Sequence, residues 1–591
     1  MKLSDNPIIF LFKKVWQYSH GNRKKLTVGY TLLVLSNISG FFEPLVVALL
    51  LNTIQLEGVT SANVTKIIWI TALFIGLTLF FWLFHGPGRV IEEENAFLLR
   101  ANFKKYMLDG TMRLPLQWHV DHHSGDTYDK VNSASKSLED FGSNIFQVVQ
   151  IIIKLVSSII VLAYFNLNSA FIVLLLLIIG LMIMFAFNKR LRKRYIYLHK
   201  LENNVSAKIF DVITNITTVI ILRLESLLSR EIMKKMLKPH LYFVKTRIIE
   251  EGKWALVSLF TAFMKFGSLS IYIYTSYTAG TTILLGTLYA LYGYVDKITD
   301  VFFHLAWQYG QFVYQKASLD NSEKISKEFR EKNERDKVSL DKSWRNIHID
   351  HLTFSYHKKK EGRLDLNGIS FDFNKNENIA LIGESGSGKT TFLKLIRGLY
   401  TPKEISLSID GKKIHGGFES IQESITLIPQ EPEIFQSTMR HNITVGVPRS
   451  DEDIKKVSDM AEFTKVYQRL PKKLSSSIVE KGVNLSGGEK QRLALARGLL
   501  ASMDKAIVLL DEPTSSVDYH TEMTIYENIL KSFRGKVIIS SIHRLHLLTL
   551  FDKIYMFKDG KIIAGGSFDQ LLKESKEFNK VWSRYKLKSR K

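Results

Sequence analysis

The sequence contains no cysteine, although it is 591 residues long. This absence excludes disulfide bonds, thiolate metal sites and a cysteine nucleophile, and it agrees with a reducing compartment. Acidic residues are also scarce, because 57 Asp and Glu stand against 80 Lys and Arg, which gives a net charge of +23. Such an excess is typical of nucleic-acid-binding proteins and of membrane proteins with basic cytoplasmic loops.

The first twenty residues are not expected to form a cleavable signal peptide. Their apolar run is short, Lys13 and Lys14 interrupt it, and no small-residue cleavage site follows. Residues 1–25 are therefore predicted to contain an amphipathic helix that lies on the membrane surface.

Long apolar runs are confined to the first half of the chain. A helix needs about 20 mostly apolar residues to cross a bilayer. Six segments meet this expectation, and they are 26–52, 67–88, 143–165, 169–188, 254–279 and 282–312. The sequence thus predicts an all-α transmembrane domain over residues 26–316.

The connections between these spans predict their orientation. The long segments 89–142 and 189–253 carry basic clusters such as "NKRLRKRY", so they are expected in the cytoplasm together with both termini. They still have a helical pattern, which predicts spans that extend well beyond the bilayer. The position of the positive charge therefore favours a membrane protein over a nucleic-acid-binding one.

The second half of the chain has a different character. Residues 317–345 are polar and highly charged, which predicts a linker. From 346 to 591, β-rich runs alternate with helical runs, as in a mixed α/β domain.

A glycine-rich loop opens this second domain. The segment "NIALIGESGSGKTTFLKLIRGLY" is predicted to form a strand, a turn and a helix, and Gly383, Gly388, Lys389 and Thr390 fit the phosphate-binding pattern G-x-x-x-x-G-K-[ST]. Glycines allow backbone N–H groups to converge on phosphate at a helix N-terminus. Lys389 is expected to reach the β and γ phosphates, and the Thr390 hydroxyl is expected to bind Mg²⁺.

Three further apolar strands end in polar side chains. Asp511 and Glu512 follow "KAIVLL", and we expect Asp511 to hold Mg²⁺ and Glu512 to act as general base on water. His543 follows "KVIISSI" and could donate a hydrogen bond to the γ-phosphate, whereas Gln430 follows "ITLIP" and could contact Mg²⁺ and the attacking water. The alternative is that these residues are ordinary solvated strand ends.

These motifs together resemble the ATP-binding cassette (ABC) family, and the resemblance covers essentially the whole chain. "GESGSGKTT" is similar to its Walker A loop, "IVLLDE" to its Walker B strand, and "NLSGGE" at 484–489 to its signature sequence. The resemblance implies that Tyr356 stacks on adenine. It also implies ATP contacts from Gly383, Ser385, Gly386, Ser387, Gly388, Lys389, Thr390 and Thr391.

The same resemblance implies a dimer with two ATP molecules at its interface. The segment "SSVD" at 515–518 is similar to the family's D-loop. Ser486, Gly487 and Gly488 of one subunit, with Asp518 of its D-loop, would then close over the ATP held by the other subunit. The partner is either a second copy or a related half-transporter. Small departures from the family pattern are Glu489 in place of the commoner Gln, and Pro513 and Ser516 where many exporters have Ala.

Six spans fused ahead of one cassette resemble an exporter half-transporter, whose dimer exchanges its fourth and fifth spans. The cytoplasmic turns at 114–123 and 208–218 would be coupling helices, received by the cassette at 430–435 and around Glu480. ATP-driven closure of the cassettes would then open the spans outward.

The first of these turns is rich in histidine. "WHVDHHSGD" contains His119, Asp121, His122, His123 and Asp126, and such side chains are able to bind Zn²⁺. The alternative is a polar docking surface without metal, which we favour.

Ionisable residues within spans indicate function by default. The candidates for a substrate cavity are Glu43, Lys154, Lys265, Asp296, Asp300 and His304. Asp296, Asp300 and His304 recur at i, i+4 and i+8, which places them on one face of a helix. They either line a cavity for a polar or amphipathic substrate or form a polar network between helices.

The sequence therefore predicts a multi-pass protein of the plasma (cell inner) membrane, in contact with membrane lipids, that uses ATP and Mg²⁺ to export or flip a lipid, glycan, peptide or drug. Two alternatives are an ATP-gated channel or regulator with the same fold and a soluble ATPase that acts on nucleic acid. Glu512 argues against the first, since a gate need not keep a hydrolytic base, and the spans argue against the second, so no nucleic-acid partner is expected.

Overall fold

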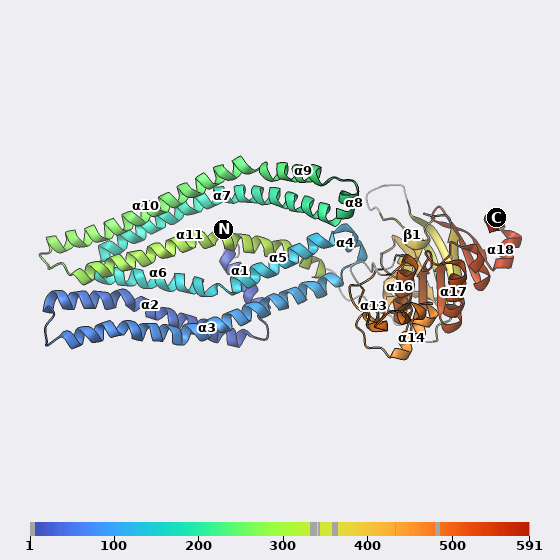
Figure 1. Cartoon of the computed structure of the whole chain (residues 1–591), viewed down its shortest axis with the longest axis horizontal. Coiled ribbons are helices and arrows are strands. Elements are labelled where there is room, and N and C mark those ends of the chain that lie inside the picture. Colours follow the sequence, from blue (N-terminus) through green and yellow to red (C-terminus); the bar gives the residue numbers. More distant parts are fainter. Residues whose placement is uncertain are drawn as a thin grey trace. The chain divides into compact units, whose positions relative to one another are not determined.

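The computed structural model describes residues 6–330, 340, 343–356, 364–431, 433–478 and 485–589. The chain forms two compact units (Figure 1). The first comprises Met1–Arg113 and His123–Phe329, and the second comprises Leu114–His122 and Arg330–Lys591. A short piece of the helical half of the sequence therefore belongs to the second unit.

The described part of the first unit is helical. Its elements are α1 (Pro7–Tyr18), α2 (Arg23–Glu57), α3 (Val64–Met112), α5 (Ser124–Gly142), α6 (Ile145–Phe165), α7 (Leu167–Thr214), α8 (Ile216–Ile221), α9 (Glu225–Leu237), α10 (His240–Thr278) and α11 (Leu285–Arg330). α3 has 49 residues. At about 1.5 Å per residue such a helix is roughly 70 Å long, more than twice the hydrocarbon thickness of a bilayer. The helices thus continue beyond any membrane span, as the sequence predicts.

Five helical segments within the described residues are long and apolar enough to cross a membrane. They are Arg23–Glu57, Val64–Met112, Ile145–Phe165, Leu167–Thr214 and Glu225–Thr278. The sixth expected span, 282–312, lies in α11, which is long enough but is not among the five. Asp296, Lys297 and Asp300 interrupt its apolar run, so its hydropathy alone does not identify it as a span.

Helices of the first unit pack side by side in pairs. α2 contacts α3, α7 contacts α10, and α6 contacts both α2 and α7, as Figure 1 shows. One face of α11 supplies fully buried side chains to the core of this unit, among them Tyr294, Val295, Ile298 and Phe302. Asp296 and Asp300 of α11, by contrast, are 51% and 61% exposed.

A very short connection joins two of these helices. Asn166 alone separates α6 from α7, and its side chain accepts a hydrogen bond from Ser169 N at 2.8 Å. The Asn166 amide also donates to Thr275 Oγ1 of α10 at 3.0 Å. The α6–α7 turn is therefore capped and tied to α10.

The segment expected to be a linker begins as helix. α11 extends to Arg330, so residues 317–330 are part of a helix rather than an irregular connection. Ser322 and Leu319 are fully buried on this extension. The prediction of a linker from 317 onward is thus wrong for its first part, because charged residues on an exposed helical face have the same composition as a linker.

The second unit contains two β-sheets, as expected for a mixed α/β domain. One has the order β2 (Leu366–Asn374), β1 (Asn346–Phe354), β4 (Glu404–Ile409), β5 (Lys412–Ile414), and its described pairs are antiparallel. The other has the order β10 (Lys561–Gly566), β9 (Lys553–Lys558), β3 (Asn378–Gly383), β8 (Val537–Ser541), β7 (Ile507–Asp511), β6 (Ile425–Ile428). Strands β9, β3, β8, β7 and β6 run parallel to one another.

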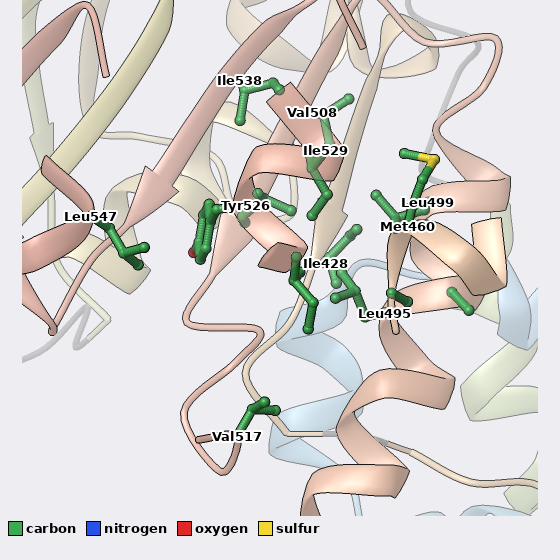
Figure 2. Close-up of a cluster of buried hydrophobic side chains, with 14 of the residues drawn as sticks. Ile428, Met460, Leu495, Leu499, Val508, Val517, Tyr526, Ile529, Ile538 and Leu547 are labelled. Carbon is green, nitrogen blue, oxygen red and sulfur yellow. The ribbon is translucent and has the colours of Figure 1, made fainter. Parts of the chain in front are cut away.

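Helices cover this larger sheet and enclose its core. They are α12 (Lys389–Ile396), α13 (Met439–Thr444), α14 (Asp451–Met460), α15 (Thr464–Gln468), α16 (Gly487–Ala501), α17 (Tyr519–Ser532), α18 (Phe568–Glu574) and α19 (Lys576–Ser589), with α4 (Leu116–Asp121) also in this unit. Short 3₁₀ turns are η2 (Gly417–Ser420), η3 (Gln422–Ser424), η4 (Lys473–Ser475) and η6 (Leu545–Leu550). Figure 2 shows part of the buried cluster, in which side chains of β6, β7 and β8 meet those of α14, α16 and α17.

The parallel strands bring distant sequence motifs to one edge of the sheet. β3 ends at Gly383, β7 at Asp511 and β8 at Ser541, and β6 ends at Ile428, two residues before Gln430. Because parallel strands have their carboxyl ends at the same edge, the residues that follow them gather there.

Candidate active site

The loop between β3 and α12 has a backbone that needs glycine. Gly386 and Gly388 have φ of 79° and 109°. A Cβ at Gly383 would lie 2.2 Å from Phe557 O, and one at Gly388 would lie 2.6 Å from Leu366 Cδ2. The buried Ser387 Oγ has no hydrogen-bond partner among the described residues. A tight loop at the start of a helix, with an unsatisfied hydroxyl, fits a phosphate group.

Lys389 is the first residue of α12, and its side chain is buried. Its Nζ donates to the carbonyl oxygens of Gly383 and Glu384, at 2.9 Å and 3.2 Å. Burial lowers the pKa of Lys389, and the nearby carboxylates of Glu512 and Asp511 partly oppose this shift. The ammonium group is thus held over the loop, where it can bind a phosphate.

Thr390 and Asp511 form the part of the site that fits Mg²⁺. Thr390 Oγ1 donates to Asp511 Oδ1 at 3.0 Å. Burial raises the pKa of Asp511, and the hydrogen bond from Thr390 opposes that rise. A hydroxyl and a carboxylate beside a phosphate loop are the oxygen ligands that Mg²⁺ prefers, so the residues present suit the ion.

Glu512 lies between two further polar side chains. His543 Nε2 is 2.5 Å from Glu512 Oε1, and Gln430 Nε2 donates to Glu512 Oε2 at 2.9 Å. Glu512 itself has φ of 47°, an uncommon conformation for a residue other than glycine. Strained backbone of this kind gathers at functional sites. The Glu512 carboxylate lies close enough to Lys389 of the loop to oppose the lowering of that lysine's pKa.

The structure therefore brings together Gln430, Glu512 and His543, which the sequence places on three separate strands. Gln430 contacts the expected base rather than Thr390 or Asp511, so its expected role toward Mg²⁺ stays a prediction. Tyr356 borders the same loop, because its hydroxyl donates to Thr391 Oγ1 at 3.3 Å. Its ring also meets Tyr400 edge-on, with 5.1 Å between ring centroids.

The second glycine run starts helix α16. Ser486 is the N-cap residue and forms a capping box with Glu489, in which Ser486 N donates to Glu489 Oε2 at 2.9 Å. Arg469 forms an ion pair with the same carboxylate. Although burial would raise it, the hydrogen bonds from Ser486 and the charge of Arg469 hold the pKa of Glu489 below its usual value.

No hydrogen bond among the described residues joins this helix start to the loop at 383–391. It contacts the D-loop instead, since a Cβ at Gly488 would lie 2.9 Å from Ser516 O. Asp518, which the sequence places in the site in trans, caps α17 by accepting from Thr521 N at 3.0 Å. Asn484 and Glu480 lie outside the described residues.

Sequence reasoning missed Gln491. Its side chain is almost fully buried, donates to Ser515 Oγ at 2.7 Å and accepts from Ser516 N at 2.7 Å. The same amide reaches Gln430 O at 3.5 Å. Gln491 therefore connects α16 to the D-loop and to the segment that carries Gln430.

Sequence reasoning also missed an ion pair behind Glu512. Glu522 is 4% exposed, and it accepts hydrogen bonds from Thr514 Oγ1 at 2.7 Å and from Arg544 at 3.1 Å. Arg544 also donates to Val517 O at 2.9 Å. Since Arg544 follows His543, this pair attaches the histidine segment to the D-loop. The sequence signal that could have indicated this ion pair was the acidic residue Glu522 in the first turn of α17.

Comparisons with known proteins agree with this geometry. A family model described as the ABC transporter transmembrane region matches residues 26–293, and one described as ABC transporter matches residues 366–515. The chain belongs to the ABC transporters. A solved bacterial Atm1-family ABC exporter with ATP bound has the same fold, with a TM-score of 0.83 over 95% of this chain and 99% of the other, at 21% identity.

Relatives of this ABC transporter differ in how much of their length is matched. An uncharacterised ABC transporter ATP-binding protein of Bacillus subtilis, YfiC, is 23% identical over 95% of this chain and 92% of its own length. The mitochondrial iron-sulfur clusters transporter atm1 of Aspergillus fumigatus is 32% identical, over 45% of this chain and 36% of its own. The glutathione/L-cysteine transport protein CydD of Bacillus subtilis is 33% identical, over 39% of this chain and 40% of its own. The match thus spans well under half of the last two relatives.

The transporter's membrane half pairs its charged side chains. Lys265 Nζ lies 2.5 Å from Asp296 Oδ1, Lys154 lies 3.8 Å from Asp300, and Lys297 lies 3.3 Å from Glu43. Each lysine is less exposed than its acid partner. The polar network that the sequence left as one of two alternatives is thus present, whereas contact of these residues with substrate stays a prediction.

The histidine-rich turn contains no cluster of metal ligands within the described residues. His122 stacks on Trp118, with 4.2 Å between the ring centroids, and its Nδ1 lies 2.8 Å from Trp118 O. Asp126 is bound to Lys130 at 2.5 Å, and Gln117 donates to Asp121 at 3.0 Å. Leu116 of α4 packs against a buried cluster of the second unit.

Proposed function

We propose that this protein is an ATP-hydrolysing exporter that moves a polar or amphipathic compound across the cytoplasmic membrane, or between its leaflets, by alternating access. The observation that carries the proposal is the Glu512 carboxylate, held between His543 and Gln430 beside the phosphate loop. A protein that only bound ATP would not need this arrangement. The membrane domain in the same chain is the part whose conformation ATP hydrolysis would change.

Hydrolysis follows from the positions of these side chains. Glu512 accepts the proton of a water that attacks the γ-phosphate, and Gln430 orients the same carboxylate. Lys389 and the loop amides bind the negative charge on the phosphates, and His543 donates to the γ-phosphate. Thr390 and Asp511 would hold Mg²⁺, and the bound ion would neutralise charge on the phosphate oxygens.

Two chains are needed to complete the site in this proposal. The N-terminus of α16, capped by Ser486, offers unpaired N–H groups and the positive end of a helix dipole, which suit phosphate. It is not hydrogen-bonded to the loop of its own chain within the described residues. A second copy, or a related half-transporter, would place Ser486, Gly487 and Gly488 opposite that loop.

Coupling to the membrane domain is proposed for both cytoplasmic turns. α4 is itself part of the second unit, where its Leu116 packs against a buried cluster. The other turn, α7 to α9, exposes apolar side chains such as Ile213, Ile221 and Leu222, at 63%, 72% and 60%. Exposed apolar surface of this kind indicates a binding surface, and we assign it to the partner's cassette.

The transported compound belongs to this proposal as well. The names of two relatives mention iron-sulfur clusters and glutathione or L-cysteine, whereas our sequence analysis favours lipids, glycans, peptides or drugs. We keep the broader class, a polar or amphipathic compound. Relatives include mitochondrial and bacterial proteins, and the basic cytoplasmic loops support a bacterial-type inner membrane orientation.

Transport in sealed vesicles distinguishes this proposal from a channel. The full-length protein is reconstituted into liposomes with its ATP sites outward, and uptake from a panel of labelled peptides, glycosides and lipids is followed with ATP and Mg²⁺. An exporter accumulates its substrate above the outside concentration, and Glu512→Gln does not. Equilibration without accumulation, the same in Glu512→Gln, would instead identify an ATP-gated channel.

A further inference from the structure

A cavity of about 570 Å³ lies in the first unit, between α11 and the junction of α5 with α6. None of the residues predicted for ATP lies near it in sequence, and of the predicted cavity residues it includes only His304. The two walls are antiparallel. Gln308 of α11 bonds to Gln147 of α6, and Phe312 meets Phe141 edge-on with ring centroids 5.6 Å apart.

Each wall presents a row of polar side chains at helical spacing. On α11 these are His304, Gln308, Gln311 and Gln315, which recur at i, i+4, i+7 and i+11. The other wall carries Asp140, Asn144 and Gln147, also spaced by four and three. This spacing places the α11 row on one face of that helix. The second row spans the end of α5, the turn residue Asn144 and the start of α6, so polar side chains line both walls of the cavity.

Two of these buried amides have a carbonyl oxygen without a hydrogen-bond partner among the described residues. Gln308 and Gln315 are each 8% exposed, and their Oε1 atoms accept no hydrogen bond within the described residues. Buried polar atoms in folded proteins almost always have a partner, and each exception calls for an explanation. Two unpaired carbonyl oxygens in one cavity need donors, which a ligand with N–H or O–H groups would supply.

The charge of the lining restricts the ligand further. The lining includes no Lys or Arg, and its carboxylate is Asp140. An anionic group would have no cationic partner there and would face that carboxylate. The exposed ring of Trp307, together with Phe141 and Phe312, offers apolar surface to the rest of the molecule.

We propose that this cavity is the substrate site of the transporter, and that it selects small neutral or cationic compounds rich in N–H or O–H donors over anionic ones. This inference rests on the proposed function but adds to it the site and the charge of the substrate. Terminally blocked peptides and glycosides both carry the N–H or O–H donors that the two unpaired carbonyl oxygens need. An anionic peptide such as glutathione has donors but carries the wrong charge.

The absence of cysteine allows a direct binding test. In full-length protein in lipid nanodiscs, Gln311→Cys introduces one thiol at an exposed position of the cavity, and Gln17→Cys on α1 is the matched control. The rate of modification by a small maleimide is measured with a terminally blocked tripeptide, with a neutral glycoside, or with S-methylglutathione, which is anionic and has no free thiol.

The blocked tripeptide or the glycoside, at ten times its Kd, should slow modification of Cys at 311 about tenfold by occupancy and leave the control unchanged. Which of the two protects identifies amide or hydroxyl donors. Adding Gln308→Leu and Gln315→Leu should abolish protection, while Gln17→Leu in the same background should not. Dimer elution and ATP binding are measured on each variant to show that it is folded.

Several results would overturn the inference. These are protection by S-methylglutathione equal to that by the neutral compounds, protection that survives both leucine substitutions, or no protection by either neutral compound. The test needs no ATP hydrolysis, so its failure is separate from failure of the proposed function. Accumulation of an anionic substrate in vesicles would support export and contradict this site.

Discussion

At the scale of single residues, the site depends on one carboxylate and its two partners. Glu512 has a left-handed backbone conformation, so its side chain leaves the strand direction that Asp511 follows. His543 and Gln430 then contact separate oxygens of Glu512. The Glu512 carboxylate is suited to act as a base because of where these two contacts hold it.

Glu512→Gln keeps the size of the side chain but replaces one acceptor oxygen with an NH2 group and removes the ability to accept a proton. We expect the ATPase rate of the purified transporter to fall by about 10²- to 10⁴-fold, the usual contribution of a general base. ATP binding should persist, because Lys389 and the loop are unchanged. Steady-state phosphate release and nucleotide binding on the same preparation measure both, and near-normal turnover would show that Glu512 is not the base.

Glu489 departs from the commoner Gln, and the structure gives the physical reason. Gln at this position would still complete the capping box with Ser486, but it would lose the ion pair with Arg469. Because Arg469 is 59% exposed, we expect Glu489→Gln to cost less than about 1 kcal/mol of local stability. Hydrogen exchange of the first-turn amides of α16 measures this difference.

The stability difference between wild type and Glu489→Gln should also depend on pH, in a direction that follows from the pKa of Glu489. The folded-state pKa of Glu489 lies below its ordinary value of 4.5, so its ionised form contributes stability above that pH. This contribution is lost as the pH falls through the lower folded-state pKa. The exchange difference between wild type and Glu489→Gln should therefore be present at neutral pH and disappear in acid. A difference independent of pH would mean that the ion pair is not its cause.

At the scale of elements, helix α16 connects parts of the cassette that serve different functions. Its N-terminus is the proposed phosphate contact for a partner's ATP, whereas Gln491, one turn later, binds the D-loop and reaches the Gln430 segment. These hydrogen bonds connect α16, within one chain, to the D-loop that follows Glu512 and to the segment that carries its partner Gln430.

Gln491→Leu would keep the volume of the side chain but remove its hydrogen bonds to Ser516 N and Ser515 Oγ. Each lost hydrogen bond costs about 0.5–1.5 kcal/mol, so we expect the D-loop to loosen and hydrogen exchange at residues 514–518 to increase. ATPase activity should fall while ATP binding is kept. Gln17→Leu, at an exposed position of α1, is the control. Unchanged exchange in the D-loop would show that Gln491 does not hold it.

Elements with strong local signals could be predicted from the sequence. The loop "GESGSGKTT" and the strands before Asp511 and His543 lie where the pattern places them, because glycine torsions and buried β-branched runs leave few alternatives. The boundary after span six could not be predicted, since an exposed charged helix and a charged linker have the same composition. Gln491 and Arg544 were missed because their partners, Ser516 and Glu522, become neighbours only in the folded chain.

At the scale of the whole molecule, each chain carries one phosphate loop and one signature helix, which are not hydrogen-bonded to each other within the described residues. Family membership and the Atm1-family fold agree with a dimeric exporter. In such a dimer every ATP site takes its loop from one chain and its signature from the other. The two chains are then equally necessary for either site.

Mixing two inactive variants tests this arrangement directly. Lys389→Ala removes the phosphate-binding ammonium, and Ser486→Arg blocks the start of α16 with a bulky cation, so each variant alone should have almost no ATPase activity. Co-expressed with separate affinity tags and purified through both, the mixed dimer has one site with an intact loop from one chain and an intact signature from the other. Its ATPase activity should clearly exceed that of either variant, and the same tagged pair with Lys389→Ala in both chains should stay inactive.

If the mixed dimer were inactive while each parent bound its partner normally, either the loop and the signature act within one chain or both sites must be intact for any turnover. A singly mutated dimer, in which only one chain carries Lys389→Ala, separates these two outcomes because it retains one complete site under either arrangement of loop and signature.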